Sequence, residues 1–153
     1  KTNPKLKLLI VGDGPEKNTL QKLTKSLEQK SHVAFLGNIP NSDIGEIFSK
    51  CLVSISASKS EAFGIVNIES LREGTPVICT NTEGAKDIIV NGKNGFIVDL
   101  TKKNDLSKTI SKIFKNWDLF SVNALNTFNE KYSKENISVH AEKIINILRN
   151  VNN

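Results

Sequence analysis

The sequence contains no long apolar segment, and none of its apolar runs approaches the ~20 residues that a membrane-spanning helix requires. No secretory signal is visible at Lys1 either. The 153 residues are 38% hydrophobic and 24% charged, which is typical of a globular domain. We therefore expect a soluble chain that forms one domain.

Residues that commonly bind metals are also scarce. The two cysteines, Cys51 and Cys79, have no neighbours at metal-site spacing, and the two histidines, His32 and His140, lie in no cluster. No group of aspartates suited to a divalent ion is evident. The sequence therefore predicts no metal site and two buried free thiols, as in a reducing compartment.

Several phosphate-binding and hydrolase motifs are missing. There is no GxxxxGK[ST] loop and no GxSxG elbow. The glycine-rich segment IVGDGP, Ile10 to Pro15, lacks the third glycine of a dinucleotide fingerprint because Lys17 stands in its place. This segment predicts either a plain strand-to-helix turn or a turn that also approaches a ligand.

The basic charge gives little support for nucleic-acid binding. The net charge is +5, but the lysines are spread among asparagines and serines through most of the sequence. No aromatic RNA-binding signature or helix-turn-helix stands out. We expect a solvated surface and no nucleic-acid partner, while weak attraction to an anionic membrane surface stays compatible.

Short apolar runs alternate with segments of helical periodicity. Strands that alternate with helices predict an α/β fold with a parallel, doubly wound sheet. The expected strands are 7–11, 32–36, 52–56, 77–79 and 96–98. The expected helices are 16–29, 42–50, a segment from about 63 to Gly74, 117–128 and 133–148. A further helix is expected to present Leu106, Ile110, Ile113 and Phe114 on one apolar face.

Ligands of such sheets bind beyond the carboxyl ends of the strands. The segments expected at that edge include two glycines, Gly12 and Gly37, and two loops, Ser58 to Gly64 and Thr80 to Gly84. We expect Thr82-Glu83-Gly84 to form a glycine turn. Further along, Asn91-Gly92 and Asn94-Gly95 predict a tight turn in left-handed conformations.

Two carboxylates bracket the segment EAFGIVNIE, Glu61 to Glu69. Apolar spacing predicts that a helix begins near Phe63 or Gly64, and its free N–H groups would favour a phosphate. Glu61 would lie on the loop side of this anion site, with Glu69 on the helix. The alternative is that both acids are ordinary solvated residues, and their spacing alone does not decide between the two.

The sequence around these acids resembles a known family. The segment SKSEAFGIVNIESLREGTPVICTNTEGAKDIIVNGKNGFIVD, Ser58 to Asp99, is similar to the donor-binding region of glycosyltransferase family 4, whose usual wording is S-x-x-E-G-F-G-L-V-x-L-E-A-M-A-x-G-x-P-V-V. IVGDGP and FLGNIP, Phe35 to Pro40, match two further landmarks in the right order. The resemblance covers nearly the whole chain.

This resemblance implies a GT-B glycosyltransferase, in which two Rossmann-like domains flank a cleft. Residues 1–153 would be the single C-terminal, nucleotide-sugar-binding domain, without the N-terminal acceptor domain. The implied activity is a retaining, hexosyltransferase-type transfer from a nucleotide diphosphate sugar to an acceptor hydroxyl. It would need no metal and no cofactor. It would serve cell-surface polysaccharide or glycolipid assembly, in the cytoplasm or at the inner face of the membrane.

The resemblance also implies roles for particular residues. Glu61 would be the catalytic residue beside the transferred sugar, and Glu69 would accept the ribose hydroxyls. The remaining donor-binding residues would be Phe63, Gly64, Ile65 and Val66 at the diphosphate, Gly37, Asn38 and Ile39 at the base, and Gly12 and Gly14 beside the nucleotide.

Three departures from the family pattern stand out. Ala62 replaces a glycine, Glu83-Gly84 with Asp87 replaces a glycine pair and a glutamate, and the GR…KG segment with its cationic clamp is not in the chain. We therefore expect a truncated piece that is inactive alone. A non-catalytic nucleotide-sugar-binding subunit and a GT-B epimerase or phosphorylase are the alternatives to a transferase.

Overall fold

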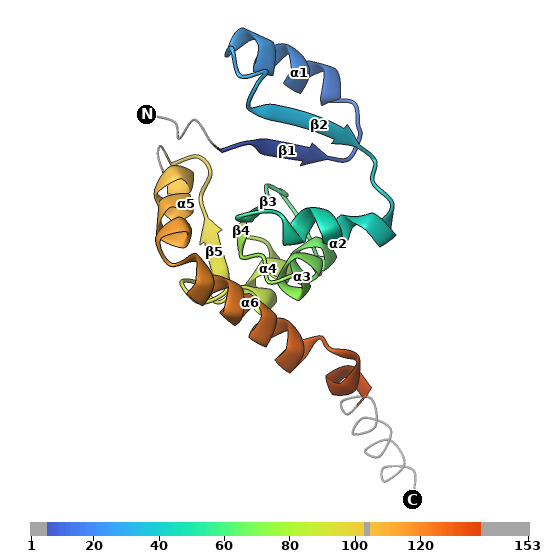
Figure 1. The fold of residues 1–153 in the computed structure, drawn as a ribbon, viewed down its shortest axis with the longest axis vertical. Helices are drawn as coiled ribbons and strands as arrows, with labels where there is room; N and C mark the ends of the chain where they lie inside the picture. The colour runs from blue at the N-terminus through green and yellow to red at the C-terminus, as the bar shows by residue number, and fades with distance from the viewer. Residues whose placement is uncertain (1–5, 103–104, 139–153) are drawn as a thin grey trace, which may run out of the picture. The chain divides into compact units, whose positions relative to one another are not determined.

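The computed structural model describes residues 6–102 and 105–138 of the chain. Strands and helices alternate along most of it (Figure 1), as the hydrophobic pattern predicts. The strands are β1 (Leu8–Val11), β2 (Val33–Gly37), β3 (Ser54–Ser56), β4 (Val77–Thr80) and β5 (Gly95–Val98), and the helices are α1 (Lys17–Ser26), α2 (Asn41–Ser49), α3 (Ile65–Arg72), α4 (Glu83–Ile88), α5 (Asp105–Lys115) and α6 (Trp117–Lys131).

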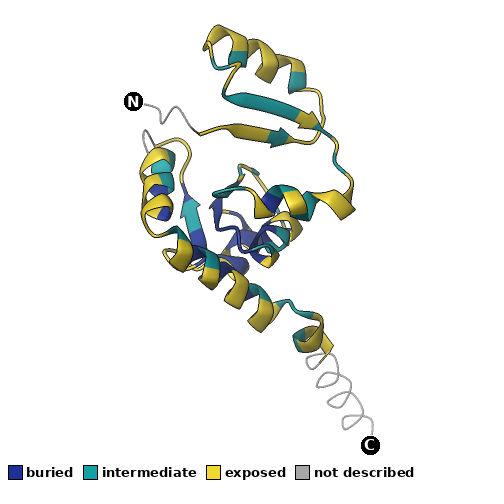
Figure 2. Ribbon diagram, in the orientation of Figure 1, coloured by how far each residue is buried: buried dark blue, intermediate teal, exposed yellow. Residues whose placement is uncertain are grey.

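The chain divides into two compact units, Lys1–Ile44 and Gly45–Asn153. In the first, β1 pairs in parallel with β2, from Leu8 opposite Val33 to Val11 opposite Gly37, with a shift of register after Ile10. None of the described residues of this unit is fully buried, as the yellow and teal ribbon of Figure 2 shows. This unit therefore has strands and a helix but no buried core of its own.

The second unit contains a three-stranded parallel sheet in the order β3-β4-β5. Ser54 lies opposite Val77, and Val77 in turn lies opposite Gly95. The central strand β4 is almost entirely buried, because helices cover both faces of the sheet. Parallel sheets of α/β proteins are buried in this way, so the predicted α/β fold with parallel strands is confirmed.

Alternate residues of β4 enter two separate apolar clusters. Val77 and Cys79 pack on one face against side chains of α3, α4 and α6, with Leu71 and Ile88 among them. Ile78 faces the other way and packs against α5 and the start of α6. Since side chains of a strand point alternately to its two faces, β4 organises both halves of this core.

Polar side chains connect the elements around the sheet. The Asn94 amide is fully buried, and its Nδ2 donates to the Ile88 carbonyl at 3.0 Å and lies 3.2 Å from Thr127 Oγ1. Its Oδ1 accepts from the Val90 N–H at 2.9 Å. Asn94 therefore joins the end of α4, the turn before β5 and α6 through satisfied hydrogen bonds.

Two details of the turn before β5 differ from the sequence prediction. Gly92 has a left-handed conformation with φ of 80°, as predicted, but Gly95 does not, because it is already the first residue of β5. Glycine is needed there for a different reason, since a Cβ at position 95 would lie 2.1 Å from the Val77 carbonyl oxygen. Close pairing with β4 is what requires this glycine.

The helices depart from the prediction in two places. The segment expected to be a glycine turn is the capped start of α4, which the pattern did not predict. Phe114 does not join the buried face of α5 and is 59% exposed, while Ile113 is fully buried. Most of the predicted helix 133–148 lies outside the described residues. Among the described helices, none has the length and apolar character needed to cross a membrane.

We predict that Asn94→Ala destabilises the protein strongly. The substitution removes the amide that bonds to Ile88, Val90 and Thr127, and it leaves buried groups without partners. We expect the free energy of unfolding to fall by roughly 3 kcal/mol, to be measured by urea denaturation. Asn126→Ala, at an exposed position of α6, is the matched control and should change it little. Equal effects of the two substitutions would contradict this account of Asn94.

Candidate functional site

The helix α3 begins at Ile65, and Gly64 is its N-cap residue. Gly64 has φ of 85°, a left-handed conformation that glycine adopts without strain. A Cβ at this position would also lie 3.0 Å from Asn67 Nδ2 and from Ile88 Cδ1. The predicted start of the helix near Phe63 or Gly64 is therefore confirmed, and Gly64 is required by both conformation and space.

The first turn of α3 presents backbone donors at the surface. The N–H groups at the start of a helix have no partner within the helix, and this end carries a partial positive charge. Ile65 and Val66, which begin α3, are 60% and 50% exposed. Their surroundings therefore leave room for an anion at the helix end, which is the position that the sequence predicted.

An open groove of about 240 Å³ runs beside this helix. Three of the predicted site residues contribute to it, namely Phe63, Ile65 and Glu69. The half-buried Glu69 carboxylate has no ion pair among the described residues, so its oxygens are free to accept hydrogen bonds. The other residues that line the groove are Ile68, Arg72, Phe128, Tyr132 and Ile137.

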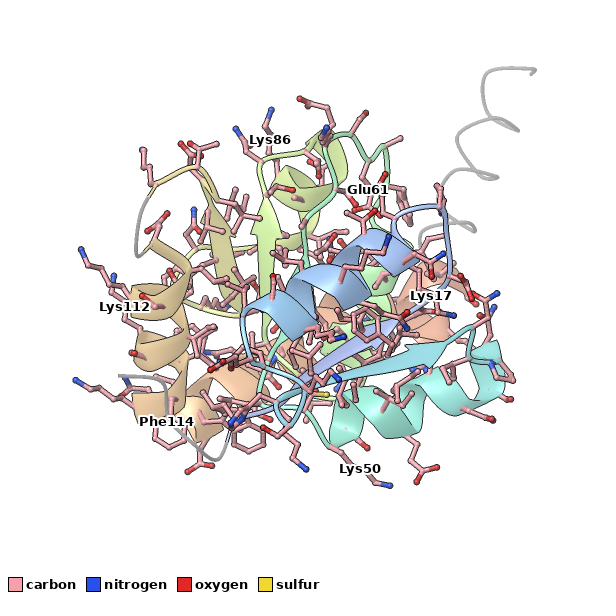
Figure 3. All side chains as sticks on the ribbon, turned by 90° about the horizontal axis from the view of Figure 1, so that it is seen from above. Lys17, Lys50, Glu61, Lys86, Lys112 and Phe114 are labelled. Carbon is pink, nitrogen blue, oxygen red and sulfur yellow. The ribbon has the colours of Figure 1, made fainter. Side chains whose placement is uncertain are left out.

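Glu61 lies on the loop that leads into α3 (Figure 3) and is half-buried. Its carbonyl oxygen accepts a hydrogen bond from the Gly84 N–H at 3.1 Å. Burial raises the pKa of the Cys79 thiol to about 11, and the negative charge of Glu61 contributes to this shift. The Glu61 carboxylate therefore lies close enough to the core strand β4 to act on its thiol.

The segment after β4 is the main correction at this site. We predicted a glycine turn at Thr82-Glu83-Gly84, but Thr82 caps α4, and its Oγ1 accepts from the Ala85 N–H at 3.3 Å. Gly84 is therefore a helical residue. A Cβ on Gly84 would lie 2.5 Å from the carbonyl carbon and oxygen of Phe63, so this helix touches the loop that carries Glu61.

In the first unit, the predicted site residues Gly12 and Gly37 lie together at the ends of β1 and β2. The Gly12 N–H donates to the Gly37 carbonyl at 2.7 Å, so the ends of β1 and β2 meet there. Gly14 follows in an open turn, where a Cβ would contact no other atom within 4 Å. The next loop carries Asn38, which is exposed, and Ile39, which is half-buried.

A local ion pair holds the turn after β1. Asp13 Oδ2 lies 2.6 Å from Lys17 Nζ, and Asp13 Oδ1 accepts from the Gly14 N–H at 2.8 Å. The bond to Lys17, and then the bond to Gly14, lowers the pKa of the Asp13 carboxyl. Lys17, which occupies the place of the third glycine, thus stabilises the turn.

Sequence reasoning missed two polar residues near Glu61. Asn67 is 1% exposed, and its Nδ2 has no hydrogen-bond partner among the described residues. Thr80 donates from Oγ1 to the Ser58 carbonyl at 2.5 Å. An amide in the first turn of α3, between Val66 and Ile68, was a visible signal for Asn67, whereas the bond of Thr80 joins segments that are distant in sequence.

Possible metal ligands do not gather in the described part of the chain. Residues 6–102 and 105–138 bring no three His, Cys, Asp or Glu side chains together in a suitable group. The features assembled around α3 are instead a helix end, two carboxylates and an apolar groove. These suit a ligand that combines an anionic group, hydroxyls and an apolar or aromatic part.

Comparisons with known proteins agree on one family. The family model described as glycosyl transferases group 1 matches residues 1–135. N-acetyl-alpha-D-glucosaminyl L-malate synthase of Bacillus anthracis is 31% identical over 113 residues, which cover 74% of this chain and 29% of that protein. Alpha-monoglucosyldiacylglycerol synthase of Acholeplasma laidlawii is 28% identical, with coverage of 88% and 34%.

Solved structures show the same fold. TarM is 26% identical, has a TM-score of 0.80, and is matched over 94% of this chain and 29% of its own. A mutant of TarM from S. aureus has been solved in complex with Fondaparinux, alpha-GlcNAc-glycerol and UDP. The chain spans 20% to 39% of the length of the curated relatives that it matches.

We predict that the Cys79 thiol is inert in the native protein. Its pKa of about 11 leaves about a thousandth of it as thiolate at pH 8, and the residue is 2% exposed. The half-buried Cys51 should therefore react first with DTNB, as followed by mass spectrometry. Glu61→Gln should lower the pKa of Cys79, because a neighbouring negative charge disfavours the thiolate. Labelling of Cys79 as fast as Cys51 in folded protein would contradict the prediction.

Proposed function

Since this chain belongs to the group 1 glycosyltransferases, we propose that it is the donor-binding domain of a retaining family 4 enzyme. The enzyme would transfer a sugar from a nucleotide diphosphate sugar to an acceptor hydroxyl. The observation that carries the proposal is the N-terminus of α3, which stands between Glu61 on its entry loop and Glu69 on its second turn.

The diphosphate would bind at the N-terminus of α3. Ile65 and Val66 are exposed at the start of α3, where the N–H groups of Phe63 to Val66 would donate to phosphate oxygens, and the helix dipole favours the charge of the phosphate. Charge grows on the departing diphosphate in the transition state, so these donors would stabilise the leaving group. This role needs no titrating side chain at the helix end.

Glu69 would bind the ribose. Its carboxylate has two acceptor oxygens and no ion pair among the described residues, and it lies on the groove beside Phe63 and Ile65. Paired hydroxyls on adjacent carbons of a ribose can both donate to one carboxylate.

Glu61 would contact the transferred sugar and hold its hydroxyls. The bond between the anomeric carbon and the diphosphate oxygen breaks, and the acceptor oxygen forms a new bond on the same face. The acceptor proton passes to the departing phosphate oxygen, so no protein base is needed. Retention of configuration follows from this scheme, and independence of metal is a further part of the proposal that rests on the family resemblance.

The acceptor would be recognised elsewhere in the enzyme. The chain spans less than two fifths of the curated relatives that it matches, and we propose that residues 1–153 are the C-terminal half of a two-domain protein. The acceptor domain and the cationic clamp on the diphosphate would lie outside this chain, which alone would not transfer sugar. The names of a lipid-modifying and a polymer-modifying relative favour a glycan or glycolipid acceptor. We propose that the transfer takes place at the inner face of the membrane.

A non-catalytic nucleotide-sugar-binding subunit is the second candidate, and an epimerase the third. Each would bind the same donor, so binding alone does not distinguish them. The test uses the complete polypeptide with a panel of labelled UDP, GDP and ADP sugars and with glycan and lipid acceptors. Transfer of labelled sugar to an acceptor supports the transferase. Binding without transfer supports the subunit, whereas interconversion of donor sugars without acceptor supports the epimerase.

We predict that Glu69→Ala in the complete enzyme weakens nucleotide affinity at least tenfold. The substitution removes two charge-assisted hydrogen bonds to the ribose, each worth about 1.5–3 kcal/mol in a protein. Titration calorimetry with UDP measures the change, or with GDP or ADP if the panel selects those bases. Glu130→Ala, at an exposed position of α6, is the control and should bind normally. Unchanged affinity in Glu69→Ala would remove its proposed role.

A further inference from the structure

The loop that carries Glu61 is fastened to the segment that follows β4. Thr80, the last residue of β4, donates from Oγ1 to the Ser58 carbonyl at 2.5 Å. The Gly84 N–H in α4 donates to the Glu61 carbonyl at 3.1 Å. The loop is thus held at its beginning and at Glu61 itself by groups of one short segment.

A third contact fixes the exit of the loop into α3. A Cβ on Gly84 would lie 2.5 Å from the carbonyl carbon and oxygen of Phe63, so the two backbones are in direct contact. Gly84 is fully buried, and Phe63 directly precedes the N-cap residue of α3. The end of β4 and the start of α4 therefore determine the path of the whole loop.

The direction of the Glu61 side chain depends on this path. Among the described residues, no cation pairs with its carboxylate, and no side chain donates to it. An unpaired carboxylate on a loop is oriented by its backbone. Of the three contacts that set this backbone, only the bond from Thr80 is made by a side chain, so it is the one that a substitution can remove without adding atoms.

We propose that Thr80 is a positioning residue, which directs Glu61 at the transferred sugar by holding the Ser58 carbonyl. The inference rests on the proposed contact between Glu61 and the donor sugar. Thr80 touches neither sugar nor nucleotide in this scheme. Its effect should therefore fall on the sugar end of the donor, while the ribose and diphosphate contacts of α3 persist.

Thr80→Val tests this role, because valine keeps the shape of threonine and loses the donor. In the complete enzyme, with the nucleotide sugar that the panel selects, we expect kcat to fall about tenfold and nucleotide affinity to stay within about twofold. Saturation-transfer NMR should show weaker contact to the sugar protons relative to the base protons. Thr80→Ser retains the hydroxyl and should restore both readouts.

Thr75→Val is the matched control for stability. Thr75 Oγ1 donates to the Phe48 carbonyl at 2.6 Å, so this variant also loses a bond from a threonine hydroxyl to a backbone carbonyl, at a more buried position away from the loop. It should lower the melting temperature at least as much as Thr80→Val but leave kcat and the NMR contacts unchanged. If Thr80→Val does not fold, Thr80→Ala is compared with Thr75→Ala by the same measurements.

Three results would overturn the proposal. These are an unchanged kcat in Thr80→Val, an equal loss of nucleotide and sugar contacts, or the same loss of kcat in Thr75→Val. Failure of the proposed function is a separate outcome, since the unsubstituted enzyme would then neither bind nor transfer any sugar of the panel. Normal transfer by the unsubstituted enzyme together with normal transfer by Thr80→Val would reject only the role of Thr80.

Discussion

The close contact between Gly84 and the backbone of Phe63 is the constraint on which the rest of this site depends. It brings α4 against the entry of α3, and the bond from the Gly84 N–H to the Glu61 carbonyl follows from the same approach. Any side chain at position 84 would displace the loop, the N-cap of α3 and Glu61 together. The path of the Glu61 loop and the local packing are therefore set by one glycine.

The buried core of the second unit holds the segments that make this contact. The strand β4 is buried on both faces, and it leads directly into Thr80 and the cap of α4. Asn94 joins the far end of α4 to the turn before β5 and to α6 through buried hydrogen bonds. The six-residue helix α4 is thus held by hydrogen bonds at both ends.

The sequence predicted those strands and helices whose own residues show a clear hydrophobic pattern. Alternating apolar runs gave all five strands, and the helical spacing of Ile65, Ile68 and Leu71 placed the start of α3 within two residues. The helix α4 was missed because it is short and contains glycine and aspartate, which are weak helix formers. Its start was nevertheless visible, since Thr82 is a good N-cap residue followed by an acid.

The remaining differences concern contacts between distant segments. Phe114 follows Ile113 and fits the helical pattern, yet it falls just beyond the edge of the buried face. The bond from Thr80 to Ser58 joins residues 22 positions apart, and no local pattern encodes it. The roles of Glu61 and Glu69 came from the resemblance to a family, and they stay predictions that binding measurements can test.

The surroundings of Gly64 limit which residues evolution or design can place there. Asparagine and aspartate tolerate left-handed backbone, so they often replace glycine where conformation is the only requirement. At Gly37 such a substitution would cause no clash, because no atom of a residue beyond its chain neighbours lies within 4 Å of the position of a Cβ. At Gly64 the same Cβ would meet Asn67 and Ile88 at 3.0 Å. The two positions share a backbone conformation but differ in sequence tolerance, so an asparagine acceptable at the first would disturb the second.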